Sequence, residues 1–101
     1  MARLVVQVPH QVGQEAASQR LREAAGQVER QYAAQVSELV QQWNGHSLDF
    51  SFRTYGLRFQ GTLAVEHQQV HVHCNLPLAA VMFKSQIERV MRDELGKILQ
   101  T

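Results

Sequence analysis

Residues 57–76 read LRFQGTLAVEHQQVHVHCNL, and apolar side chains alternate with polar ones on both sides of the central EHQQ. Such alternation is typical of strands with one buried face and one solvated face. If the chain reverses at His67-Gln68, or over a four-residue loop at 66–69, apolar residues stay opposite one another along the hairpin. The predicted buried pairs are Val65 with Val70, Leu63 with Val72, Gly61 with Cys74, and Phe59 with Leu76. The stretch therefore predicts an antiparallel hairpin that buries one face.

The same alternation decides what the histidines and the single cysteine of this stretch can do. Successive side chains of a strand point to opposite faces, so Cys74 is predicted to face the core and His71 and His73 to face water. A shared Cys–His metal site within the strand is thereby excluded. His71 and His73 alone can chelate zinc, but their predicted cross-strand neighbours are poor third ligands. These neighbours are Ala64, Thr62 and Gln60. A solvated polar face is favoured over a metal site, and no cofactor is expected.

Three further strands are predicted from similar patterns. Residues 2–8, ARLVVQV, are rich in valine and stop at a proline, which has no N–H to donate to a ladder. The Asn44-Gly45 pair is a strong hairpin signal, because a type I′ turn needs positive φ at both central positions. A hairpin needs a strand on each side, so we expect strands at 37–43 and 47–53. A continued helix is the alternative for 37–43, because its apolar residues also fit helical spacing.

Two helices complete the predicted fold. Apolar residues recur at spacings of three and four from Gly13 to about residue 34, and again over 76–100, where Pro77 suits a helix entry. The two stripes are Ala17, Leu21, Ala24, Ala25, Val28 and Tyr32, and then Phe83, Ile87, Val90, Met91, Leu95 and Ile98. The sequence thus predicts one α+β domain over 1–101. It has an antiparallel sheet of about five strands, two helices on one face and the element order β-α-β-β-β-β-α.

The composition narrows the classes of function. Ten Lys and Arg against nine Asp and Glu give a net charge of +1 over 101 residues, without the basic excess of a nucleic-acid binder. One cysteine cannot form an internal disulfide, which favours a reducing compartment. The apolar run after Met1 is too short for a signal peptide or a membrane span. We therefore expect a cytoplasmic protein that binds no nucleic acid and is not integral to a membrane.

No motif in the sequence indicates catalysis. The chain has no Gly-rich phosphate loop, no nucleophile elbow and no close pair of carboxylates on one face. His10 follows the first strand and could act as a base, but a helix-entry role is favoured because no partner is in view. Trp43 and His46 flank the Asn-Gly turn and are predicted to pair across it. A hydrolase that uses His10 or the two strand histidines is the least favoured function, and no residue is assigned a catalytic role.

One segment, LPLAAVMF at 76–83, is apolar on every side of the helix that it is predicted to begin. A surface helix needs one apolar stripe, so this segment either enters the core, which is favoured, or covers something outside. The candidate residues for contact with a partner or an apolar surface are Leu76, Leu78, Val81, Met82 and Phe83. A cavity for an acyl chain between helices and sheet is a second candidate site. Its predicted lining is Phe50, Phe52, Phe59 and Leu63.

Several pieces of the sequence, taken in order, resemble one family. They are PHQVGQEAA at 9–17, WNGHSLDF at 43–50, GTLAV at 61–65, VHV at 70–72 and FKSQIE at 83–88. In this order they resemble the small bacterial polyhydroxyalkanoic acid system family, also described as a polyhydroxyalkanoate granule region. The resemblance implies a non-enzymatic accessory protein at storage granules or their synthesis machinery. Its partners would be the granule surface or granule proteins, and the apolar segment 76–83 adds a second copy of the chain as a possible partner. A binder of a small acyl-type ligand and a small hydrolase are the alternatives.

Overall fold

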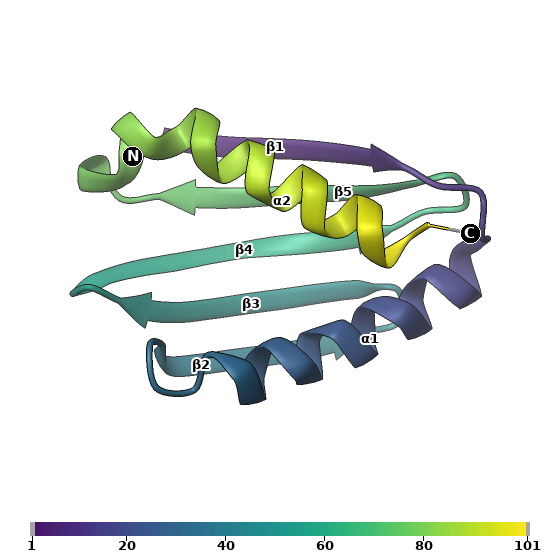
Figure 1. The fold of residues 1–101 in the computed structure, drawn as a ribbon, viewed down its shortest axis with the longest axis horizontal. Helices are drawn as coiled ribbons and strands as arrows, with labels where there is room; N and C mark the ends of the chain where they lie inside the picture. Colours follow the sequence, from purple (N-terminus) through teal and green to yellow (C-terminus); the bar gives the residue numbers. More distant parts are fainter. Residues whose placement is uncertain (1, 101) are drawn as a thin grey trace.

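The computed structural model describes residues 2–100, which form one antiparallel sheet and two α-helices (Figure 1). The elements are β1 (Ala2–Pro9), α1 (Gln14–Gln31), β2 (Ser37–Asn44), β3 (Ser47–Thr54), β4 (Leu57–Val65), β5 (Gln69–Leu76), the 3₁₀ helix η1 (Leu78–Phe83) and α2 (Lys84–Ile98). The predicted α+β class and the predicted order of strands and helices are confirmed.

The five strands lie in the order β1-β5-β4-β3-β2, and all neighbours are antiparallel. The hairpin of β4 and β5 has the register that the sequence predicts. Val65 pairs with Val70, Leu63 with Val72, and Gly61 with Cys74. The ladder ends at Gln60 and Asn75, so the fourth predicted pair, Phe59 with Leu76, lies one position beyond it.

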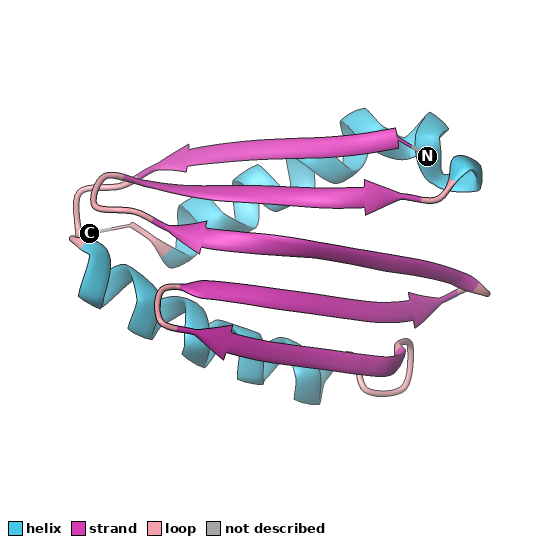
Figure 2. Cartoon of the chain, turned by 180° about the vertical axis from the view of Figure 1, so that it is seen from behind, coloured by secondary structure: helices cyan, strands magenta, loops and turns pink. Residues whose placement is uncertain are grey.

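Both helices cover the same face of the sheet, and Figure 2 shows the other face with no helix over it. The core lies on the covered face, where α2 runs across β1 and β5 (Figure 1). Its largest fully buried side chains are Leu4, Val6, Val70 and Leu76. None of the described helices combines the length and the hydropathy that crossing a membrane requires.

Gly61 of β4 lies where the sheet leaves no room for a side chain. This residue pairs with Phe50 on one side and with Cys74 on the other. A Cβ atom on Gly61 would overlap the carbonyl oxygen of His73 and would lie 2.9 Å from Cζ of Phe50. Because protein interiors are close-packed, such an overlap could be relieved only by moving the neighbouring residues. Glycine is therefore required here by the close approach of backbone and ring.

The turn between β2 and β3 lies one residue later than the Asn-Gly pair predicts. Asn44 pairs with Ser47, so Gly45 and His46 form the two-residue turn. Gly45 has a φ of 63° and His46 has no positive φ, which is typical of a type II′ turn with glycine at its first central position. The predicted strand before the turn is confirmed, and the alternative of a continued helix is excluded.

Helix α1 ends at Gln31, a few residues earlier than predicted, and its second half lies away from the sheet. Its buried residues, Ala17, Ser18 and Leu21, all belong to the first half. Every residue from 27 to 35 is exposed, including the apolar Val28 and Tyr32. Figure 1 shows α1 and α2 diverging from the end where α1 begins. The apolar stripe of α1 therefore extends beyond the part of the helix that the fold covers.

The segment 76–83 does not form the first turn of one long α-helix. It forms η1, and α2 begins only at Lys84. A 3₁₀ helix has three residues per turn, so few of its positions can face the sheet. Leu76 and the small Ala80 are buried, whereas the remaining large apolar side chains are not. The exposed ones are Leu78, Val81, Met82 and Phe83. The favoured prediction that this segment enters the core is thus wrong for most of its side chains.

Candidate functional site

The two histidines of β5 lie on the uncovered face of the sheet. Their ring centroids are 4.5 Å apart. Across the ladder His71 faces Ala64 and His73 faces Thr62, as the sequence predicts. Nε2 of Gln7 lies 3.2 Å from Nε2 of His71. Within residues 2–100, no group of three or more His, Cys, Asp and Glu side chains is arranged to hold a metal ion. The pair is therefore two imidazoles on a polar surface, with a glutamine beside one of them.

The thiol of Cys74 lies on the opposite face from these histidines. Its residue is 3% exposed and belongs to the core cluster. Burial raises the pKa of the Cys74 thiol above its ordinary value, because desolvation disfavours the thiolate. A thiol kept protonated in this way is a weak nucleophile. Cys74 therefore acts as a small apolar core residue.

His10 fastens the end of β1 to the loop between β4 and β5. Its backbone N–H donates to the carbonyl oxygen of Gln68 at 2.9 Å, and its ring Nε2 donates to the carbonyl oxygen of Glu66 at 3.0 Å. The side chain is buried, and its Nδ1 has no hydrogen-bond partner among the described residues. Both hydrogen bonds of His10 are with backbone groups of the β4–β5 loop, so the residue holds the end of β1 to that loop.

A serine, a histidine and a glutamate meet where α1 begins, an arrangement that the sequence did not reveal. Oγ of Ser18 lies 2.7 Å from Nδ1 of His46, and Nε2 of His46 lies 3.3 Å from Oε1 of Glu15. With its proton on Nε2, the ring donates to Glu15 and accepts from the Ser18 hydroxyl. These residue types occur together in serine hydrolases. Ser18, however, is 3% exposed within a helix, so no substrate can reach its hydroxyl.

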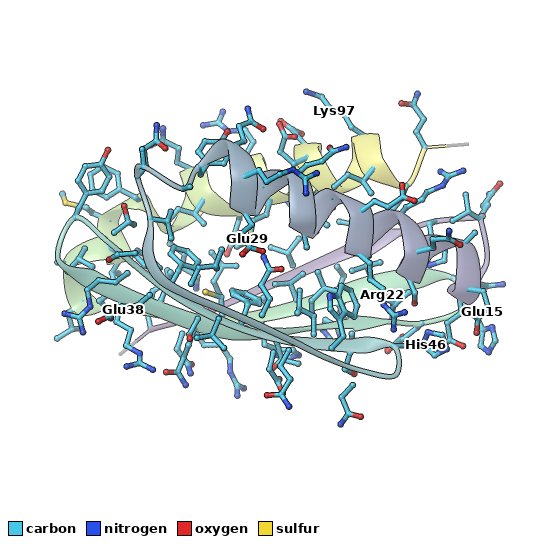
Figure 3. The ribbon with its side chains drawn as sticks, turned by 90° about the horizontal axis from the view of Figure 1, so that it is seen from below. Glu15, Arg22, Glu29, Glu38, His46 and Lys97 are labelled. Carbon is cyan, nitrogen blue, oxygen red and sulfur yellow. The ribbon has the colours of Figure 1, made fainter. Side chains whose placement is uncertain are left out.

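The contacts of Arg22 show that this cluster attaches the β2–β3 turn to α1. Nη2 of Arg22 donates to the carbonyl oxygen of Gly45 at 2.8 Å, and its guanidinium lies 5.0 Å from the centroid of the Trp43 ring. Figure 3 shows Arg22, Glu15 and His46 together at this end of the molecule. The predicted pairing of Trp43 with His46 is wrong, because the shifted turn places Trp43 opposite Leu48. Helical spacing puts Glu15, Ser18 and Arg22 on one side of α1, but only the fold shows which loop they face.

The most exposed apolar side chains gather at the other end of the long axis, around η1 and the β3–β4 turn (Figure 1). We define the apolar end as Tyr55, Leu78, Val81, Met82, Phe83 and Val90. Tyr55 is 94%, Met82 83% and Leu78 75% exposed. Tyr55, Phe83 and Val90 also line one shallow hollow, so the turn and the helices form a continuous surface. The predicted contact residue Leu76 is fully buried and takes no part in it.

A separate pocket of about 410 Å³ lies between the end of α1, the loop that follows it and the strands β2 and β3. We call it the helix pocket. Its lining residues are Val28, Glu29, Tyr32, Ala33, Val36, Leu39 and Phe52. The volume falls within the range of small-molecule sites, roughly 300–1,000 Å³. Six of the seven lining residues are apolar or aromatic, and Glu29 is the charged one.

The four residues predicted to line an acyl cavity have different surroundings. Leu63 belongs to the buried core, and Phe50 and Phe59 pack against that core. Phe52 lines the helix pocket, and its ring stacks on Phe59 with centroids 5.2 Å apart. The fold therefore brings one of the four to a pocket between helix and sheet. The other walls come from α1 and β2, which the sequence pattern did not indicate.

Comparison with known proteins identifies the family of the chain. The family described as "Putative polyhydroxyalkanoic acid system protein" matches residues 4–99. The chain belongs to this family. No curated protein and no solved structure shows significant similarity to it. Membership of the polyhydroxyalkanoic acid system family confirms the resemblance seen in the sequence.

Proposed function

We propose that this member of the polyhydroxyalkanoic acid system family is a non-enzymatic accessory protein that acts in the cytoplasm. It attaches to the surface of polyhydroxyalkanoate granules through its apolar end. Family membership supports the connection with polyester storage. The observation that carries the proposal is the exposure of Leu78, Met82 and Phe83 on η1. Phe83 also lines one hollow with the exposed Tyr55. Side chains of this size are rarely left together in water unless they contact something.

The chemistry of an aliphatic polyester suits this surface. The polymer has ester oxygens that accept hydrogen bonds, and it presents alkyl groups against which apolar side chains can be buried. Fully burying a leucine or methionine side chain contributes about 1.5–3 kcal/mol. Given how much of Leu78 and Met82 is exposed, these two contribute together about 3 kcal/mol. Because attachment also costs translational freedom, the expected result is reversible adhesion.

Attachment through the apolar end would also orient the molecule on the granule. The apolar end and the cluster of Glu15, Ser18 and His46 lie at opposite ends of a molecule 36 Å long (Figure 1). The polar end would therefore point away from the polyester. The uncovered face of the sheet would stay accessible to water and to other granule proteins.

Co-sedimentation of the purified protein with isolated granules tests the proposal. We expect the wild-type protein to sediment with the granules and the double variant Leu78→Ser/Met82→Ser to bind about a hundredfold more weakly, because about 3 kcal/mol of burial is lost. The matched control is Val5→Ser/Val40→Ser, which removes two exposed valines from the uncovered face of the sheet. This control should bind as the wild type does.

Two results would count against granule attachment through the apolar end. The first is wild-type protein that stays wholly in the supernatant, or a Leu78→Ser/Met82→Ser variant that binds as tightly as the wild type. The second is a wild-type dimer that this variant converts to a monomer without any change in granule binding. Analytical ultracentrifugation of both proteins measures the second result, and it would assign the apolar end to contact between two copies.

A further inference from the structure

The second half of α1 presents apolar side chains that nothing in the described chain covers. Val28, and Tyr32 directly after the last helical residue, continue the stripe that packs on the core earlier in the helix, yet both are exposed. They do not face open solvent alone, because they line the helix pocket together with Leu39 and Phe52 of the sheet. The fold thus leaves a space between Val28 and Tyr32 on one side and Leu39 and Phe52 of the sheet on the other.

The arrangement along α1 explains why a space remains there. At its start the helix is tied to the β2–β3 turn by Ser18 and Arg22. One turn later, Nε2 of Gln41 donates to the carbonyl oxygen of Ala25 at 3.3 Å. Beyond Ala25 no hydrogen bond joins the described part of the helix to β2 or β3, and the helix pocket opens at this point. The next hydrogen bond to the sheet comes after the helix, where Oγ1 of Thr54 donates to the carbonyl oxygen of Gln35 at 2.8 Å. The pocket thus lies along the part of the chain between these two ties.

Glu29 is the charged residue among those that line the helix pocket, and it is exposed to solvent. Its side chain lies on the side of α1 that faces the sheet (Figure 3). Within residues 2–100 it makes no hydrogen bond or ion pair. A carboxylate accepts hydrogen bonds and repels a second carboxylate. The pocket therefore suits a ligand with an apolar body and a neutral donor group, and it disfavours an anionic fatty acid.

We propose that the helix pocket binds the hydroxyl end of a 3-hydroxyacyl ester chain. The alkyl part packs against Val28, Leu39 and Phe52, and the hydroxyl donates to the carboxylate of Glu29. Tyr32 also lines the pocket, and its hydroxyl would donate to an ester carbonyl of the same chain. The identity of the chain rests on the proposed function in polyester storage, since such polymers end in one hydroxyl and one carboxyl group. The pocket would recognise the hydroxyl end and not the carboxyl end.

Titration of the ¹⁵N-labelled protein with three matched probes tests this inference. The probes are methyl 3-hydroxydecanoate, methyl decanoate and decanoate, each kept below its aggregation limit. We expect saturable amide shifts confined to residues 28–36, Leu39 and Phe52. Methyl 3-hydroxydecanoate should bind about tenfold more tightly than methyl decanoate, because it adds a hydrogen bond to a charged acceptor. Decanoate should bind most weakly.

Three variants distinguish binding through Glu29 from nonspecific hydrophobic binding of the probes. Glu29→Gln should bind decanoate and the hydroxy ester with similar affinity, because it removes the repelling charge. The matched control is Glu23→Gln, an exposed position on the same helix that does not line the pocket. This control should keep the wild-type order of affinities. Ala33→Trp, which fills the pocket from an exposed position, should abolish the shifts.

The inference is overturned by an absence of saturable shifts, by shifts centred on the apolar end, or by decanoate binding as tightly as the hydroxy ester. It can fail while granule attachment holds, because the probes are soluble and no granule is present. Conversely, Leu78→Ser/Met82→Ser should bind the hydroxy ester as the wild type does. A loss of ester binding in that variant would contradict the assignment to the helix pocket.

Discussion

Replacing Gly61 by alanine should destabilise the protein strongly, although it adds only one methyl group. A Cβ atom at this position would overlap the carbonyl oxygen of His73, lie 2.9 Å from Cζ of Phe50 and lie 3.0 Å from Cα of Cys74. Two of these three atoms belong to the backbone of β5, which cannot rotate away as a side chain does. The strands β4 and β5 must separate or Gly61 must shift.

The size of the effect follows from these contacts. Overpacking a well-packed core costs about 1–3 kcal/mol, and we expect the upper part of this range because backbone must move. A loss of about 3 kcal/mol corresponds to a fall in Tm of about 15 °C for a domain of this size. Urea unfolding, followed by the fluorescence of Trp43, measures the change in the free energy of unfolding. The midpoint should fall by about 2 M at an unchanged m-value.

Gly96→Ala is the matched control, because it adds the same methyl group where nothing lies within 4 Å. Gly96 is exposed within α2, so alanine should raise the free energy of unfolding by about 0.5–1 kcal/mol through helix propensity. The two substitutions should thus have opposite signs. If Gly61→Ala costs less than about 0.5 kcal/mol, or if both variants change stability alike, the register-based account of Gly61 is refuted.

Two further outcomes concern His46 and Cys74. His46→Ala should lower the free energy of unfolding by about 1–2 kcal/mol, because the buried hydroxyl of Ser18 loses its hydrogen-bond partner. The control His67→Ala, at an exposed loop position, should change this free energy by less than about 0.5 kcal/mol. Equal effects of the two substitutions in urea unfolding would argue against the attachment of the turn to α1. The raised pKa of the Cys74 thiol means that the folded protein holds this proton more tightly than the unfolded chain does. Its contribution to stability is therefore complete below the ordinary pKa of 9.0 and is lost as the pH rises above it. The difference in unfolding free energy between wild type and Cys74→Ala should shrink from pH 8 to pH 10.5, and a constant difference would contradict the burial of the thiol.

The strands and their register could be predicted from the sequence, because both depend on neighbours along the chain. In a strand the period of two assigns each side chain to a face, and the spacing of Val65 and Val70 around a short loop then sets the register. The same rule correctly predicted that the side chain of Cys74 points to the core and that of His71 to the other face of the sheet. The Asn-Gly signal placed a hairpin correctly but shifted its turn by one residue, since Gly45 alone supplies the positive φ.

The surfaces that carry the proposals could be predicted only in part. The apolar character of η1 is visible in the letters LPLAAVMF, but its exposure is not. A run of apolar residues is compatible with a buried or an exposed segment, and the 3₁₀ geometry that turns Leu78 and Met82 outward is a property of the folded chain. The contact between Ser18 and His46 joins residues 28 positions apart, and no local pattern encodes it.

What the sequence by itself determined is the class of fold, the element order, the faces of the strands and the family. What only the tertiary structure decided is which apolar side chains stay uncovered, at the apolar end and in the helix pocket. The physical reason is that periodicity assigns a residue to a face of its own element, whereas burial requires a second element within contact distance. Within the described chain, no second element covers residues 27–35 or most of η1.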